Sequence, residues 1–154
     1  MLDDADIDNA AKAVAFCAIM HSGQICISTS RLIVQRGVSE KVIHAVVDIM
    51  RKFKAGDSHN DPEAKLSALF SEEHAIRVIN TLTDAINGGA KLLLGDLRRE
   101  GPVVQPHVLT EVKPGMTLWD KETFGPGELS VCGMACSLNF SHRGFVNKIG
   151  RAHV

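Results

Sequence analysis

Helical and strand-like segments alternate along the chain, and this alternation constrains the fold more than any other feature of the sequence. Apolar residues recur at helical spacing over residues 6–20, where Asp6 is a suitable N-cap and Gly23 is placed to end the run. Residues 31–35 follow with Leu-Ile-Val at their centre, which indicates a short buried strand. The chain is therefore predicted to begin with a helix that leads into a sheet.

The same alternation continues towards the carboxyl end. Ser39 and Ser71 are candidate N-caps of a second and a third helix, Gly88-Gly89 stops the third, and the polar residues 55–65 suit a loop between them. Three further runs are strand-like: residues 92–94, 103–104 and 108–112. Strands that alternate with long helices predict an α/β fold, with a largely parallel sheet and flanking helices.

Composition and charge exclude several classes of protein. The formal net charge is −1 and aromatic residues make up 5% of the chain, with no Tyr, so a nucleic-acid partner is not expected. No apolar run approaches the roughly 18 residues of a membrane helix, and the acidic start is unlike a secretory signal. Four cysteines in 154 residues do not make a disulfide scaffold. We therefore expect a cytoplasmic protein with free thiols and with no membrane partner.

Cys26 is the residue whose position points most directly to chemistry. It follows a glycine-marked helix end and precedes a predicted strand, where catalytic groups are often placed. A thiol there is a candidate nucleophile, and its backbone N–H is a candidate donor to an oxyanion. The apolar neighbours Ile25 and Ile27 favour a different interpretation, a small buried residue, which is the more common role of a lone cysteine. Position alone therefore favours packing.

The residues around Cys26 carry a resemblance that changes this interpretation. Residues 16–35, FCAIMHSGQICISTSRLIVQ, resemble the active-site segment of the aldehyde dehydrogenase family. The core of that segment is Gly-Gln-x-Cys, followed five residues after the Cys by Arg. Gly23, Gln24, Cys26 and Arg31 match it. The resemblance therefore implies that Cys26 is the catalytic nucleophile.

A second signature lies downstream in the same register. Residues 121–126, KETFGP, are similar to the family's Glu-x-Phe-Gly-Pro, and the stretches between the two signatures also follow the family. The resemblance covers residues 3–126 and stops at Pro126, where the pattern of elements stops too. We therefore predict a partial aldehyde dehydrogenase catalytic domain over residues 1–126. Residues 127–154 are predicted to be a tail outside the family, irregular or disordered.

The resemblance implies a complete reaction. The Cys26 thiolate attacks an aldehyde carbonyl to give a thiohemiacetal, hydride passes to NAD or NADP, and water hydrolyses the resulting thioester to a carboxylic acid. The matching Glu122 accepts hydrogen bonds from the nicotinamide ribose hydroxyls, and the matching Phe124 packs beside the nicotinamide. Without the resemblance, Glu122 would be interpreted as a solvated loop residue and Phe124 as a core aromatic.

Other candidate residues near the signatures are given structural roles. His21-Ser22 resembles the branch of the family that oxidises aromatic aldehydes such as salicylaldehyde or vanillin. A helix-end histidine bonded to backbone is favoured for His21 over a catalytic Cys–His pair. Cys17 is expected to pack on the apolar helix face, and Gln24 to set the shape beside the nucleophile. No metal site is predicted, because the spacing of Cys132, Cys136 and His142 fits no standard zinc pattern.

A complete member of the family is several times longer than this chain. Its upstream part holds the Rossmann-like cofactor domain, the Asn that completes the oxyanion hole and the catalytic Glu, and no residue here matches them. We therefore expect a fragment, inactive alone, of a homo-oligomeric enzyme that acts on a small aldehyde. An alternative is a non-catalytic interaction or regulatory fragment that docks onto full-length relatives through unpaired sheet edges. A thiol redox protein is disfavoured, because there is no C-x-x-C pair.

Overall fold

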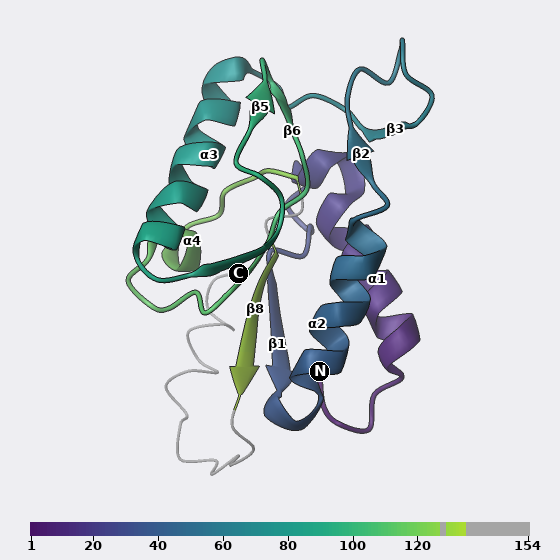
Figure 1. Cartoon of the computed structure of the whole chain (residues 1–154), viewed down its shortest axis with the longest axis vertical. Helices are drawn as coiled ribbons and strands as arrows, with labels where there is room; N and C mark the ends of the chain where they lie inside the picture. Colours follow the sequence, from purple (N-terminus) through teal and green to yellow (C-terminus); the bar gives the residue numbers. More distant parts are fainter. Residues whose placement is uncertain (127–128, 135–154) are drawn as a thin grey trace.

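The computed structural model describes residues 1–126 and 129–134, drawn in colour in Figure 1. The helices are α1 (Ile7–Ile19), the short 3-10 helix η1 (Met20–Gly23), α2 (Arg36–Met50), α3 (Glu72–Asn87) and α4 (Thr117–Asp120). The strands are β1 (Arg31–Gln35), β2 (Lys54–Ala55), β3 (Ala64–Leu66), β4 (Lys91–Leu94), β5 (Arg99–Glu100), β6 (Val103–Val104), β7 (Val108–Thr110) and β8 (Leu129–Met134). Within these two ranges, no helix has the length and apolar character needed to cross a bilayer.

The main sheet has the strand order β1-β8-β7-β4. β8 runs parallel to both β1 and β7, whereas β4 at the edge is antiparallel to β7. β4 and β7 are connected through the small β5–β6 ribbon, and antiparallel neighbours need no crossover helix. The predicted α/β class is confirmed, and the prediction of a parallel sheet holds for β1, β8 and β7.

β8 corrects the prediction made for the end of the chain. Residues 127–154 were expected to be irregular, yet residues 129–134 form a strand in the middle of the sheet. Arg31 pairs with Ser130 at one end of the β1–β8 ladder, and Gln35 with Met134 at the other. The prediction is wrong for these six residues, because pairing with two distant strands outweighs the weak local pattern. Residues 127–128 and 135–154 lie outside the described part of the chain.

Hydrogen bonds at the helix starts test the predicted caps. Asp6 and Ser71 each accept a hydrogen bond from the backbone N–H three residues later, at 3.1 Å in both cases, so these two caps are confirmed. The predicted cap Ser39 is wrong. α2 begins at Arg36, directly after β1, and Ser39 Oγ donates to the Arg36 carbonyl at 2.9 Å from within the first turn. The strand runs into the helix without a loop.

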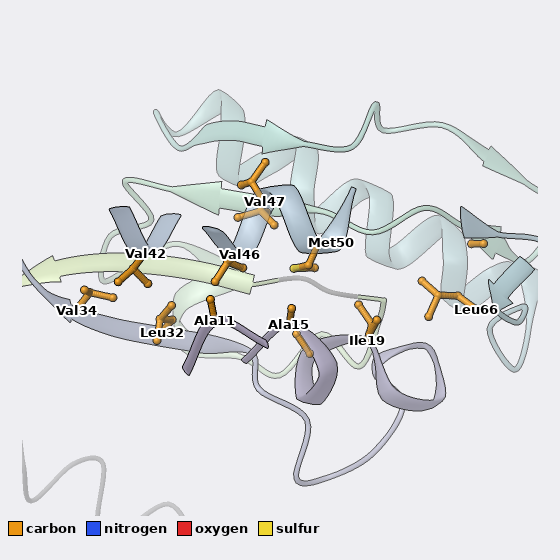
Figure 2. Close-up of a cluster of buried hydrophobic side chains, with 13 residues drawn as sticks. Ala11, Ala15, Ile19, Leu32, Val34, Val42, Val46, Val47, Met50 and Leu66 are labelled. Atoms are coloured by element: carbon orange, nitrogen blue, oxygen red, sulfur yellow. The ribbon is translucent and has the colours of Figure 1, made fainter. Parts of the chain in front are cut away.

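α1 and α2 cover one face of the sheet, and their apolar residues meet beside β1 (Figure 2). Ala11 and Ala15 of α1 are fully buried, and their small side chains let the two helices approach closely. Val42 and Val46 of α2 belong to the same cluster, together with Val34 of β1. This packing fixes the position of β1, and therefore of the turn that leads into it.

α3 covers the opposite face of the sheet. Its Val78 and Leu82 are fully buried, in one cluster with Leu109 of β7 and Val104 of β6. Successive residues of a strand point to opposite faces, and Val108 belongs to the cluster under α1 and α2 whereas Leu109 belongs to the cluster under α3. The sheet is therefore a middle layer between helices, as Figure 1 shows.

The start of the chain pairs with the outer edge of β1. The Met1 amino group donates to the Ile33 carbonyl at 2.6 Å, and the Gln35 N–H donates to the Met1 carbonyl at 3.0 Å. This is the bonding pattern of a parallel pair. Asp3 N–H also donates to Gln35 Oε1 at 3.0 Å. Part of the edge of β1 is therefore occupied by the chain itself.

His107 is a buried histidine just before β7. It is 0% exposed, Leu97 N–H donates to its Nε2 at 3.4 Å, and its Nδ1 has no partner within the described residues. Burial lowers the pKa of His107 below its ordinary value of 6.5, because an imidazolium loses its hydration in this position. The folded chain therefore favours the neutral ring over the charged one.

We expect the buried His107 to make the chain less stable in acid. Below pH 6.5 the unfolded chain binds a proton at His107 more readily than the folded chain does. The free energy of unfolding is therefore independent of this group above pH 6.5, and it decreases as the pH falls from 6.5 through the lowered pKa of the folded state. His107→Gln removes the titrating ring. The urea midpoint should therefore fall less in the variant than in the unsubstituted chain between about pH 7.5 and about pH 5.5. An equal fall of the urea midpoint with pH in the two proteins would contradict the expectation.

Candidate active site

Cys26 lies on an exposed turn between η1 and β1. The Ser28 N–H donates to the Ile25 carbonyl at 2.9 Å, which closes the turn with Cys26 and Ile27 at its centre. Cys26 is exposed and Ile27 is 74% exposed. Among the described residues, neither the Cys26 N–H nor its thiol has a hydrogen-bond partner. Cys26 is therefore not a core residue, and neither its thiol nor its N–H is engaged by another described residue.

The exposed turn predicts selective labelling of Cys26. Iodoacetamide should alkylate Cys26 about tenfold faster than Cys17, which is half-buried on α1, because reaction requires access to the sulfur. Fragment-ion mass spectrometry of the peptide that contains both residues measures the two rates. In urea the two rates should converge, which serves as the control. Equal rates in the folded chain would contradict the exposed position of Cys26.

Three successive residues with positive φ reverse the chain between α1 and this turn. His21, Ser22 and Gly23 have φ values of 51°, 56° and 71°. This conformation is unfavourable for residues other than glycine, by about 1–2 kcal/mol each. Ser22 is 1% exposed and its Oγ donates to the Ser67 carbonyl at 2.8 Å, which helps to hold the reversal in place.

Gly23 brings the second signature against the first. A Cβ atom added at Gly23 would lie 1.7 Å from the Gly125 carbonyl oxygen and 3.2 Å from the Pro126 Cα. Only glycine permits so close an approach of two backbone segments. The loop of residues 121–126, called the Glu-x-Phe loop below, is therefore packed directly on the segment that carries Cys26.

A narrow pocket lies between these two segments. One wall is formed by Ala18, Gly23 and residues 28–30, and the other by residues 122–125. Glu122 is exposed and Phe124 is half-buried. The structure thus brings Glu122 and Phe124 to the same pocket as the residues that directly follow the Cys26 turn.

Arg31 anchors the helix that leads into the Glu-x-Phe loop. Its guanidinium lies 4.5 Å from the centre of the Trp119 ring, and its Nη2 donates to the Trp119 carbonyl. Trp119 belongs to α4, which ends directly before the loop. The sequence matched Arg31 to the first signature without giving it a role, and its contact with Trp119 ties that signature to the second.

Gln24, His21 and Cys17 take structural positions around the turn. Gln24 Oε1 accepts the Phe70 N–H at 2.9 Å, in keeping with a shape-setting residue. The His21 side chain is exposed, and the hydrogen bonds at this residue run from Gln24 to its carbonyl, so among the described residues the predicted bond between its ring and backbone is not found. Cys17 is half-buried, and its carbonyl accepts the Thr29 N–H at 3.3 Å.

His74 is a residue of this site that the sequence analysis missed. It lies in the first turn of α3 and bonds the Phe124 carbonyl through Nε2 at 2.8 Å. Its only sequence signal is a histidine on the apolar face of a helix, beside Ala75 and in line with Val78. That pattern indicates burial and says nothing about a partner in a distant loop.

No metal centre is found in the part of the chain that the structure describes. Within residues 1–126 and 129–134, no group of three or more His, Cys, Asp or Glu side chains could hold a metal ion. Of the cysteines and histidine considered from the sequence, Cys136 and His142 lie outside the described residues. Cys132 lies in β8, where only the backbone is described.

Comparison with known proteins identifies the family. The model of the aldehyde dehydrogenase family matches residues 1–130. This chain belongs to the aldehyde dehydrogenase family. It is 38% identical over 126 residues to vanillin dehydrogenase from Pseudomonas fluorescens, which covers 82% of this chain and 26% of that protein. The chain therefore spans about a quarter of the length of the curated relatives it matches.

Solved structures of aldehyde dehydrogenases share the fold. The salicylaldehyde dehydrogenase from Pseudomonas putida G7, solved with salicylaldehyde, is 32% identical with a TM-score of 0.78, over 86% of this chain and 27% of that one. The glyceraldehyde-3-phosphate dehydrogenase GapN from Methanocaldococcus jannaschii, solved with NADP, is 29% identical with a TM-score of 0.80, over 88% and 29% of the two chains. Related aldehyde dehydrogenases use NAD or NADP.

Proposed function

We propose that this chain is the part of an NAD(P)-dependent aldehyde dehydrogenase that carries the nucleophile and a contact to the nicotinamide. The whole enzyme would oxidise an aldehyde to a carboxylic acid. The proposal is carried by one observation: the exposed Cys26 turn is joined, through the Gly23–Gly125 approach, to the loop that holds Glu122 and Phe124. The two signatures of the family thus meet at one pocket.

Cys26 would act as the nucleophile. Its thiolate sulfur attacks the aldehyde carbon, and the carbonyl π electrons move to the oxygen to give a thiohemiacetal oxyanion. The unpartnered Cys26 N–H is a donor for that oxyanion. A nicotinamide held by Glu122 and Phe124 would supply the acceptor for the hydride of the same carbon, so that a thioester would remain on Cys26. Water then cleaves the carbon–sulfur bond, so that the acid departs and the thiol is restored.

Glu122 and Phe124 would position the cofactor. Glu122 offers an exposed carboxylate, whose oxygens can accept hydrogen bonds from the two hydroxyls of a ribose. Phe124 lines the pocket and is half-buried, which suits an apolar surface for one face of a nicotinamide ring. A carboxylate acceptor next to an apolar ring suits the chemistry of a nicotinamide nucleoside, whether it belongs to NAD or to NADP.

An aromatic aldehyde is the substrate class we propose. The match to salicylaldehyde and vanillin dehydrogenases supports it, as does the His21-Ser22 pair in the first signature. A cytoplasmic, homo-oligomeric whole enzyme is part of the same proposal. Docking of this chain onto relatives through the edge of β1 has less support, because Met1 already bonds Ile33 and Gln35 on that edge.

A graft tests the proposed function. Residues 1–126 would replace the matching segment of the Pseudomonas putida salicylaldehyde dehydrogenase, and NADH formation with salicylaldehyde would be followed by absorbance. We expect aldehyde-dependent NADH formation, because the graft supplies Cys26, Glu122 and Phe124 in the register of the family. A folded graft that binds NAD but forms no NADH would refute the proposal. The unaltered host enzyme is the control.

A further inference from the structure

His74 is only 3% exposed, and both of its ring nitrogens have a partner within the protein. Arg77 Nη2 lies 2.7 Å from Nδ1, and the Phe124 carbonyl oxygen lies 2.8 Å from Nε2. A guanidinium has donors and no acceptor, so Nδ1 must accept from Arg77. The ring hydrogen is then on Nε2, which donates to the Phe124 carbonyl. Arg77 thus sets the tautomer in which His74 can hold the loop.

The Phe124 backbone needs such support. Its φ is +60°, in the left-handed region that disfavours residues with a Cβ atom. A residue persists in this conformation only when its surroundings hold it there. His74 fixes the carbonyl on one side of Phe124, and the close approach of Gly125 to Gly23 fixes the next residue. These two restraints fix the backbone of Phe124, and with it the direction in which its side chain leaves the backbone.

A line of contacts also links His74 to the Cys26 segment. The Phe70 ring stacks on the His74 ring, with centroids 4.5 Å apart and planes 26° apart. The Phe70 backbone N–H in turn donates to Gln24 Oε1 at 2.9 Å, two residues before Cys26. His74 of α3 and Phe70 just before this helix therefore contact the Glu-x-Phe loop and the segment that carries Cys26, respectively.

We propose that His74, oriented by Arg77, is a positioning residue that holds Phe124 in its left-handed conformation. This inference rests on the proposed role of Phe124 beside the nicotinamide. Four contacts carry it: Arg77 to Nδ1, Nε2 to the Phe124 carbonyl, the Phe70 stack, and the Phe70–Gln24 hydrogen bond. Loss of the Nε2 donor alone should release the Glu-x-Phe loop, while the stack on Phe70 remains.

Two substitutions in the full chain separate the hydrogen bond from the packing. His74→Phe keeps an aromatic ring on Phe70 but removes the N–H donor, and His74→Gln keeps a donor but removes the ring. Trypsin cleavage after the exposed Lys121 reports opening of the loop, measured against cleavage after the exposed Lys41 on α2. His59→Phe, in an exposed loop, is the matched control.

We expect cleavage after Lys121 to be about tenfold faster in His74→Phe, because the Phe124 carbonyl loses its donor. His74→Gln should restore most of the protection, and His59→Phe should leave the rate unchanged. A rate in His74→Phe equal to that of the unsubstituted chain would overturn the proposal. So would failure of His74→Gln to protect the loop better than His74→Phe, since packing alone would then explain the effect.

Two spectroscopic measurements complete the test. Long-range ¹⁵N–¹H correlations of the histidine rings should show the Nε2–H tautomer at His74, and an Nδ1–H tautomer would overturn the proposal. In the graft described above, titration with NADH followed by its fluorescence should show about tenfold weaker binding for His74→Phe than for the unsubstituted graft. If the tautomer and the protection are as expected but the two grafts bind NADH equally, the proposed cofactor role of Phe124 is wrong and the positioning of the loop stands.

Discussion

Replacing Gly23 with alanine is expected to lower the free energy of unfolding by more than about 3 kcal/mol. The added Cβ atom would lie 1.7 Å from the Gly125 carbonyl oxygen and 2.5 Å from the carbonyl carbon. Both are backbone atoms, so no flexible side chain can move aside, and the Glu-x-Phe loop must separate from the Cys26 segment. The φ of +71° adds strain for any residue with a Cβ atom. Urea unfolding followed by circular dichroism measures the loss.

Gly101→Ala is the matched control for this experiment. Gly101 also has a positive φ, +56°, but no heavy atom lies within 4 Å of the position its Cβ would take. Its replacement should therefore cost only the backbone strain, about 1 kcal/mol. The difference between the two variants isolates the contact with Gly125. Equal losses would show that this contact is not tight, and a Gly23→Ala chain that fails to fold is the extreme of the expected result.

The elements predicted well from sequence are those whose signals are local. α1 and α3 have a capping side chain, an apolar period and a stop, all within their own residues. The predicted start of α2 lies several residues after the observed one. Serine is a common N-cap residue, so Ser39 is the cap that the sequence predicts, but β1 leads directly into the helix and no capping side chain is used there. β8 was missed because its place between β1 and β7 depends on partners far away in the sequence.

The site divides in the same way. The signatures identified Cys26, Glu122 and Phe124 as candidates, and the exposed turn at Cys26 agrees with its place between helix and strand. The contacts that assemble them were not predictable, since Gly23 meets Gly125 across about a hundred residues and His74 reaches Phe124 across fifty. One residue of each contact, Gly23 and Phe124, has a positive φ, and the sequence does not reveal this feature of the folded backbone.

In the graft described above, Cys26→Ala is expected to lower kcat for aldehyde oxidation by at least about 1,000-fold. Without the sulfur there is no thiohemiacetal, and hydride would have to leave from a hydrated aldehyde that no group in this segment activates. Cys26→Ser should lower kcat almost as much, because an unassisted hydroxyl is a much weaker nucleophile than a thiolate. The rate of NADH formation at saturating salicylaldehyde measures both variants.

Cys17→Ala provides the matched control for that loss. It removes a thiol from the same segment, but Cys17 is half-buried on α1. Its hydrogen bond with Thr29 is made by the Cys17 carbonyl and not by the sulfur. We expect its kcat to stay within about twofold of the graft, since no step of the reaction uses that sulfur. NAD affinity should be retained in the Cys26 variants, which separates loss of chemistry from loss of folding. If Cys26→Ala kept more than a tenth of the activity while Cys17→Ala lost it, the nucleophile would have been assigned to the wrong cysteine.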